Sequence, residues 1–379
     1  MDKETIKKLY DEFLNEYDAD KKDQIWQEQS KMFREFWTDF LLNDNVKELN
    51  ESQIDEIVKI LDKNAKGSTK EDEAVAKAMI PQGVWRRMFN EIKENKEIRE
   101  KLFKIISSEN DEEVISAVNH LYKINEGRKN SLTGKSANAI CAMMFSYNPK
   151  RNLSVISLNS RERIIPFFGF ESVDFENESP GDKIIKSNKS IIKGFKSLGI
   201  FDSPRTISCF IYWNPVIDEM RKTGQAEEEV STPTEESEDI SSTENYLFYM
   251  EKELENFLIE NWDKTELGKK YELIEENGDL VSQQYRTEIG IIDILVKDKE
   301  TGQYVIIELK KNQTSDDTIG QLTRYMGWLE EKKTNGEPTK GIIIAAKWDK
   351  RLHYALKKVK DVEVYLYQVD FRLNEFKQK

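Results

Sequence analysis

Glu308 and Lys310 lie two residues apart near the end of an apolar run, YVIIELK, at residues 304–310. Side chains at positions i and i+2 of a β-strand share a face, so a strand here would point both charged groups the same way. Removing both charges from water costs several kcal/mol unless other interactions compensate. Two interpretations follow: a structural ion pair, or a metal ligand beside a catalytic lysine.

A second acid, Asp293, lies inside the neighbouring apolar run IIDILV. If the two runs form a simple hairpin centred between residues 300 and 301, Asp293 falls directly opposite Glu308. Cross-strand partners lie about 4.5–5.5 Å apart at Cβ, and two carboxylates this close repel unless a proton or cation lies between them. Oxygen ligands without histidine or thiolate suit Mg²⁺ or Mn²⁺. Lys310 would then orient or deprotonate a water molecule, or stabilise negative charge on a phosphate.

The composition limits the class of protein. The chain has 379 residues, 38% hydrophobic and 34% charged, with two histidines, too few for a histidine-based zinc site. Its apolar runs fall short of the roughly 18 residues that a membrane span requires, and its charged N-terminus does not resemble a signal peptide. Cys141 and Cys209 lie in apolar stretches, which indicates core residues in a reducing compartment. We therefore expect a cytoplasmic protein that binds no membrane.

The net charge of −13 is concentrated in one segment. Residues 222–245 hold eight acidic residues and one lysine, which together contribute −7. This segment is rich in Ser, Thr and Glu and lacks apolar periodicity, so we predict an acidic flexible linker. It separates a recognition or regulatory region, residues 1–221, from a C-terminal domain, residues 246–379. The acidic total does not exclude a basic nucleic-acid surface, because binding follows local charge.

The N-terminal region changes character near residue 125. Before that point, apolar residues recur at helical spacing. Afterwards the runs ANAICAMMFSY, NLSVISL, RIIPFFGF and TISCFIYW are typical of strands separated by Asn, Gly, Pro and Lys. The patterns therefore predict an α+β N-terminal region.

Basic residues gather after this change of character. They are Arg128, Lys129, Lys135, Lys150 and Arg151. They are interpreted either as solvated loop charge, which is slightly favoured, or as a surface that contacts phosphates. The TGKS at residues 133–136 resembles the end of a phosphate-binding loop. However, position 129 is lysine where a Walker A motif begins with glycine, so nucleotide binding is not expected.

The C-terminal domain alternates more clearly. A helix at residues 246–262 precedes several strands up to residue 310, and then helix, strand, helix and strand follow. This order predicts an α/β domain with a mixed central sheet.

Three linked blocks of this domain carry a resemblance to a known family. They read TEIGIIDILVKDKETG, YVIIELKKN and IGQLTRYMGW, after the helix MEKELENFLIENW. Residues 246–370 resemble the C-terminal nuclease domain of the NucS (EndoMS) type, in the PD-(D/E)XK superfamily with its restriction-endonuclease-like fold. The resemblance implies a metal-dependent nuclease with Asp293 and Glu308 as metal ligands and Lys310 as the catalytic lysine.

The same resemblance implies further site residues. Glu251 is the best match for the first-helix acid of such folds, and Glu255 is the other candidate. Gln321 and Arg324, one helical turn apart, would face the site or the phosphate. NucS enzymes carry a small β-rich DNA-binding domain upstream, whereas the first 221 residues here are unfamiliar. Mismatch specificity is therefore not carried over.

Together these observations predict a metal-dependent DNA endonuclease whose N-terminal region selects or gates the substrate. By analogy with other nuclease modules joined to sensor domains, the leading role is restriction or antiviral defence. Repair of mismatched or branched DNA is an alternative, and a non-catalytic nucleic-acid-binding or regulatory protein is a third. We expect DNA as a partner. We also expect either a homodimer with two sites for the two strands or a partner protein of a defence system.

Overall fold

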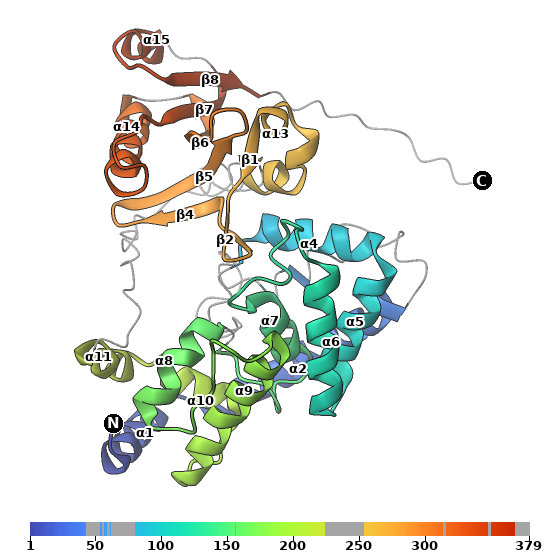
Figure 1. Ribbon diagram of the computed structural model, residues 1–379. Helices are drawn as coiled ribbons and strands as arrows, with labels where there is room; N and C mark the ends of the chain where they lie inside the picture. The colour runs from blue at the N-terminus through green and yellow to red at the C-terminus, as the bar shows by residue number, and fades with distance from the viewer. Residues whose placement is uncertain are drawn as a thin grey trace. The chain divides into compact units, whose positions relative to one another are not determined.

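The computed structural model describes residues 1–42, 54, 57–58, 61, 80–155, 157–223, 254–313, 316–347 and 350–367 (Figure 1). The chain divides into two compact units. Unit 1 comprises Met1–Glu229 and Glu275–Leu280, and unit 2 comprises Val230–Ile274 and Val281–Lys379. No helix in the described part of the chain is long and apolar enough to cross a membrane.

The described residues of unit 1 form helices and one short hairpin. The helices are α1 (Lys3–Glu16), α2 (Ala19–Leu42), α4 (Gln82–Glu94), α5 (Lys96–Ser107), α6 (Asp111–Ile124), α7 (Asn138–Tyr147), α8 (Leu158–Phe168), α9 (Pro180–Ser197), α10 (Pro204–Ile211) and α11 (Asn214–Lys222). The hairpin consists of β2 (Glu275–Glu276) and β3 (Asp279–Leu280), paired antiparallel.

Aromatic side chains hold α1, α8, α9 and α10 together. The Phe168 and Phe195 ring centroids lie 5.0 Å apart, and Phe195 lies 5.9 Å from Phe210. Tyr10 of α1 meets Phe210 edge-on at 4.9 Å. Such ring pairs add about 0.5–1.5 kcal/mol beyond the area that they bury. The N-terminal region therefore has a core of its own.

The strands predicted in the N-terminal region are wrong. ANAICAMMFSY forms α7, RIIPFFGF lies largely in α8, and TISCFIYW lies largely in α10; NLSVISL forms no strand in its described residues. Short apolar runs fit a buried helix as well as a buried strand by periodicity, and a helix buried on all sides, like α7, shows no polar stripe. At α10, Ser203 caps the Thr206 N–H and Pro204 stands at the first turn, which start a helix.

Unit 2 is a mixed sheet with helices packed on it (Figure 1). Its strands are β1 (Tyr271–Leu273), β4 (Gln283–Thr287), β5 (Gly290–Asp298), β6 (Tyr304–Gln313), β7 (Lys340–Lys347) and β8 (Val362–Leu366). Its helices are η2 (Trp262–Lys264), α13 (Glu266–Lys270), α14 (Asp316–Lys332), α15 (Lys350–Leu356) and the helical residues 254–260.

The strand order is β1-β5-β6-β7-β8, with β4 also paired to β5. Strands β1, β4 and β6 run antiparallel to β5, whereas β6, β7 and β8 run parallel to one another. The predicted mixed sheet and the alternation of helix and strand after β6 are confirmed. The assignment of this domain to the PD-(D/E)XK superfamily stays a prediction.

The predicted domain limits stay a prediction. Of the linker at residues 222–245, all but the first two residues lie outside the described part of the chain, so the acidic linker stays a prediction. Residues 275–280 fall in the predicted C-terminal domain, yet they group with unit 1. The reason is hydrogen bonding: the Lys135 N–H donates to the Asn277 carbonyl at 2.6 Å.

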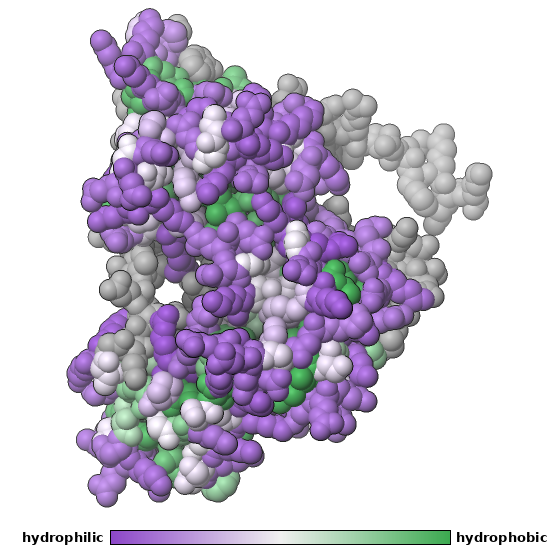
Figure 2. Space-filling view, in the orientation of Figure 1, coloured by the Kyte–Doolittle hydropathy of each residue, from purple (hydrophilic) through white to green (hydrophobic). Residues whose placement is uncertain are grey.

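The visible surface is largely hydrophilic. On the face drawn in Figure 2, apolar residues form only separated spots among hydrophilic ones. Scattered apolar side chains of this kind are normal for a protein surface and need no functional explanation.

Candidate active site

Asp293 and Glu308 lie on the adjacent antiparallel strands β5 and β6. Their register pairs Ile294 with Ile307, Leu295 with Ile306, Val296 with Val305, and Lys297 with Tyr304. Continued by one step, the register sets Asp293 opposite Glu308, as the hairpin geometry predicted. The Leu309 N–H also donates to Asp293 Oδ2 at 2.9 Å, which holds this carboxylate against β6.

The surroundings of these acids disfavour two negative charges. Glu308 is 1% exposed, and Asp293 is partly buried. Burial raises the pKa of Asp293, and the Leu309 N–H and the Lys310 charge only partly oppose that rise. Lys310 Nζ lies 2.8 Å from Glu308 Oε1, and its side chain is 27% exposed. The predicted ion pair is therefore present, and its lysine end reaches solvent.

Helix α14 covers the sheet face that carries the two acids. Its Ile319, Leu322 and Tyr325 belong to the same core cluster as Leu295, Ile306 and Ile343 of the strands. Because Ile343 pairs with Glu308 across β7 and β6, these side chains surround the acids on one face.

Tyr325 of α14 interacts electrostatically with both acids. Burial raises the pKa of its phenol, and the charges of Glu308 and Asp293 raise it further, while a hydrogen bond with the Gln321 side chain lowers it. A Cβ added at Gly290 would lie 2.5 Å from Tyr325 Oη, so a glycine is needed there. Gln321 thus reaches the site through Tyr325.

Arg324 lies on α14 beside this group. Its side chain is exposed, with the guanidinium carbon 5.9 Å from the Tyr325 ring centroid. This position leaves the guanidinium accessible to an anion in solvent. Its predicted role in binding DNA stays a prediction.

The first-helix acid is only partly described. Glu251 lies outside the described residues, whereas Glu255 is 6% exposed. Glu255 accepts from Gln283 Nε2 at 2.6 Å and from Gln284 Nε2 at 2.5 Å. Gln284 lies between two residues of β4 that pair with Ile294 and Ile292, and so across from Asp293. The two glutamines were not predicted; adjacent amides at the start of a strand were the only signal.

The five basic residues of the N-terminal region do not share one environment. Lys129, Lys135 and Lys150 are exposed. Arg128 is exposed as well, and its Nη1 lies 3.4 Å from Glu91 Oε2. Four of the five therefore remain accessible, and their contact with nucleic acid stays a prediction.

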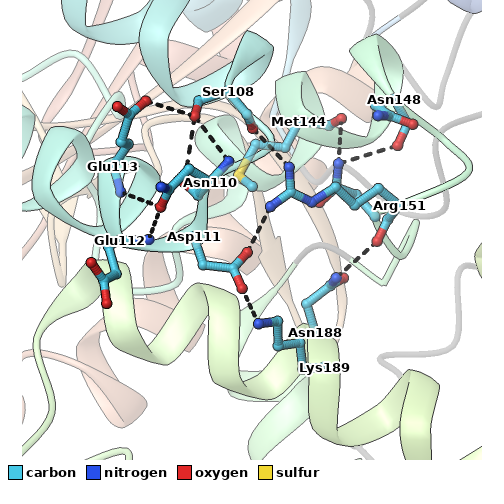
Figure 3. Close-up of polar contacts among 11 residues, drawn as sticks. Ser108, Asn110, Asp111, Glu112, Glu113, Met144, Asn148, Arg151, Asn188 and Lys189 are labelled. Atoms are coloured by element: carbon cyan, nitrogen blue, oxygen red, sulfur yellow. Dashed lines mark hydrogen bonds and ion pairs between the residues drawn. The ribbon is translucent and has the colours of Figure 1, made fainter.

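Arg151 is engaged in a structural network (Figure 3). Its guanidinium donates to Asp111 Oδ1 at 2.6 Å and to the Ser108 carbonyl at 2.7 Å. Asp111 begins α6 and also pairs with Lys189 of α9. These contacts tie the loop after α7 to two helices, which favours a structural role for Arg151 over phosphate contact.

The donor set fits a hard cation. Among the described residues, no group of three or more His, Cys, Asp or Glu side chains could hold a metal ion. The two facing carboxylates of Asp293 and Glu308 nevertheless match Mg²⁺, which is commonly held by one or two carboxylates and keeps several waters. Mn²⁺ accepts the same oxygen ligands.

Comparisons with known proteins point to one family for this part of the chain. The family model described as Endonuclease NucS C-terminal domain matches residues 252–370. Endonuclease NucS from Sulfolobus acidocaldarius is 33% identical over 109 residues, 29% of this chain and 38% of that protein. The Methanocaldococcus jannaschii protein of the same name is 36% identical over 74 residues, 20% of this chain and 27% of that protein. The chain thus spans well under half the length of these two relatives.

Two solved structures also match, each over about a third of this chain. A repair endonuclease from Pyrococcus abyssi is 24% identical, with a TM-score of 0.26 over 31% of this chain and 46% of that chain. An EndoMS complex with double-stranded DNA is 22% identical, with a TM-score of 0.26 over 32% and 45%. On the strength of the family model and the sequence relatives, the C-terminal part of this chain carries a domain of the NucS C-terminal type.

Proposed function

We propose that this chain is a metal-dependent endonuclease that hydrolyses phosphodiester bonds of DNA. The observation that carries the proposal is the arrangement of Asp293, Glu308 and Lys310 on one face of β5 and β6. The sequence relatives, named Endonuclease NucS, support this function for the C-terminal domain.

Asp293 and Glu308 would hold Mg²⁺ or Mn²⁺, and the cation would stabilise negative charge on the phosphate as a Lewis acid. Lys310 would hold or move a proton at Nζ, or stabilise charge on a phosphate oxygen. Because Lys310 is partly exposed, a substrate can approach it from solvent. Gln321 and Tyr325 would position groups beside the acids, and Arg324 would contact the DNA backbone.

We place the role in DNA repair ahead of restriction or antiviral defence. The relatives found by sequence are NucS endonucleases, which supports the repair alternative better than the analogy with sensor-linked nucleases. A protein that only binds nucleic acid would gain nothing from two facing acids, Glu308 buried and Asp293 partly buried with its pKa raised by burial. The N-terminal region would select or gate the substrate.

The test is cleavage of matched, mismatched and branched DNA duplexes by the full chain with Mg²⁺, Mn²⁺ or EDTA. We expect metal-dependent cleavage, fastest on mismatched or branched duplexes, and none with EDTA. Glu308→Gln should abolish cleavage, whereas Glu300→Gln, at an exposed acid in the β5–β6 turn, should not. Cleavage by Glu308→Gln at the rate of the unmodified protein would reject the site, and equal rates on all duplexes would reject the repair role.

A further inference from the structure

A loop of unit 1 and the hairpin of unit 1 are joined by hydrogen bonds of their backbone N–H groups. The loop is residues 131–136, before α7, and the hairpin is residues 275–280. The Lys135 N–H donates to the Asn277 carbonyl at 2.6 Å, and the Leu280 N–H donates to Ser131 Oγ at 2.5 Å. The two segments are therefore docked by specific bonds between residues about 140 positions apart.

Asp279 is the polar centre of this docking. Its Oδ2 accepts a short hydrogen bond from Ser136 Oγ, and the Ser136 N–H donates to the same carboxylate. Oδ1 is buried and has no hydrogen-bond partner. A methyl group at Gly134 would overlap Oδ1, so the loop makes room for the carboxylate only because residue 134 is glycine.

The hairpin is short, and both of its ends continue directly into strands of the sheet. Strand β1 ends at Leu273, two residues before the hairpin, and β4 begins at Gln283, three residues after it. Both strands pair with β5. Within β4, Gln284 lies across from Asp293 and donates to Glu255. The position of the hairpin therefore restrains the strand beside the candidate metal ligand.

We propose that the hairpin 275–280 is a latch, and that its docking on the loop 131–136 through Asp279 supports the nuclease site by holding the start of β4. Release of the latch removes one restraint on the chain that leads into β4, which is otherwise bonded to β5 through Ser282, and so loosens the Gln284–Glu255 contact. The docking itself is independent of any enzymatic activity. The effect on cleavage rests on the proposed function.

The latch is sensitive to pH because of where the Asp279 carboxylate lies. Its pKa is raised from 3.8 to about 6, chiefly by burial and with a smaller contribution from the charge of Glu275 of β2, while the Ser136 donors oppose the rise. Tyr122 of α6 also faces this carboxylate, and burial raises the pKa of its phenol, so it stays neutral. Lys135 of the loop is exposed and contributes only a solvent-screened charge.

The raised pKa of Asp279 determines the direction in which docking changes with pH. Because the docked state disfavours the ionised carboxylate, docking is strongest below the usual Asp pKa of about 4 and weakens as the pH rises through about 6. One pKa unit corresponds to a tenfold change in the equilibrium. Docking should therefore weaken about tenfold between about pH 5 and about pH 7.5.

Hydrogen exchange of the full chain tests the latch directly. The reporters are the Lys135 and Leu280 amides, with rates corrected for the intrinsic effect of pH. We expect about tenfold less protection at the higher pH in the unmodified protein and in Glu300→Gln, the control at an exposed acid outside the latch. Asp279→Asn should be protected equally at both pH values, because its amide is neutral and still accepts from Ser136.

Asp279→Lys should remove the protection at both pH values. If these two amides stay protected in Asp279→Lys, or if Asp279→Asn keeps the tenfold pH dependence, the latch is rejected.

A cleavage assay tests the coupling separately. Asp279→Lys should cut DNA at least about tenfold more slowly than the control Glu300→Gln, as expected when a positioning contact is lost. A variant that loses protection at Lys135 and Leu280 but cuts at the control rate would reject the coupling. If the unmodified protein cuts no DNA at all, the proposed function fails, while the exchange result still decides whether the latch exists.

Discussion

The Leu309 N–H donates to Asp293 Oδ2 at 2.9 Å, from the residue that follows Glu308 on the facing strand. This bond crosses from β6 to β5 and holds the Asp293 carboxylate toward Glu308. It also means that Asp293 satisfies a backbone donor besides its proposed role as a metal ligand, so two substitutions at this position should differ.

Asp293→Asn should abolish cleavage while the metal-free protein keeps or gains thermal stability. Burial raises the pKa of Asp293 in the folded state, so the ionised carboxylate lowers the free energy of unfolding at neutral pH, and a neutral amide removes that cost. Asp293→Ala should instead lose about 1–3 kcal/mol, because the Leu309 N–H then has no acceptor. Thermal melting with and without Mg²⁺ measures both effects, with Asp361→Asn, at an exposed position, as the control. Stabilisation of Asp293→Asn by Mg²⁺ as large as that of the control would contradict a ligand role.

Lys310→Ala should leave metal binding largely intact and slow the chemical step. Loss of a positioned proton carrier or charge stabiliser typically costs about 10²–10⁴ in rate. Lys310→Arg should not restore the rate, because a guanidinium is bulkier and does not readily give up its proton. Single-turnover cleavage measures this step, and Lys269→Ala, at an exposed ion pair of α13, is the control. A normal rate in Lys310→Ala would reduce the Glu308–Lys310 contact to a structural ion pair.

Tyr325→Phe should slow cleavage by roughly threefold to tenfold with little change in stability. The substitution keeps the ring in the hydrophobic cluster between α14 and the sheet. It removes only the hydroxyl that hydrogen-bonds to Gln321, and such a bond contributes about 0.5–1.5 kcal/mol. Gln321→Ala should show a similar loss, and the double variant should lose little more, because both changes break one contact. The comparison of single and double variants is the measurement, and Tyr354→Phe, at an exposed tyrosine, is the control. Fully additive losses would show that the two side chains act separately.

Charge reversal at Lys129, Lys135 and Lys150 should weaken DNA binding and flatten its salt dependence if this surface contacts phosphates. Each lost contact to duplex DNA lowers the slope of log K against log salt by about 0.9. Arg151→Ala should behave differently and reduce thermal stability, because it breaks the network with Asp111 and Ser108. Binding titrations at several salt concentrations decide the point. An unchanged slope in the triple variant would leave these lysines as ordinary loop charge.

Much of the candidate site could be predicted from the sequence because it is local. Two apolar runs joined by a short turn have one favoured antiparallel register, and that register alone sets Asp293 opposite Glu308. The side-chain period of a strand then puts Lys310 on the same face as Glu308. The order of helices and strands after β6 followed in the same way from changes in apolar spacing.

The tertiary structure decided what depends on residues far apart in the chain. The apolar runs of α7, α8 and α10 are helical because neighbouring helices bury them, and a run buried on every side has no periodicity from which to infer its structure. From the sequence, Arg151 could be a solvent-exposed cation. In the folded chain its Nη2 donates to Oδ1 of Asp111, 40 residues earlier, at 2.6 Å. The hairpin 275–280 joined unit 1 because Ser131, Lys135 and Ser136 supply its hydrogen-bond partners. A local sequence pattern does not reveal such partners, because contacts between residues far apart in the chain form only when the chain folds.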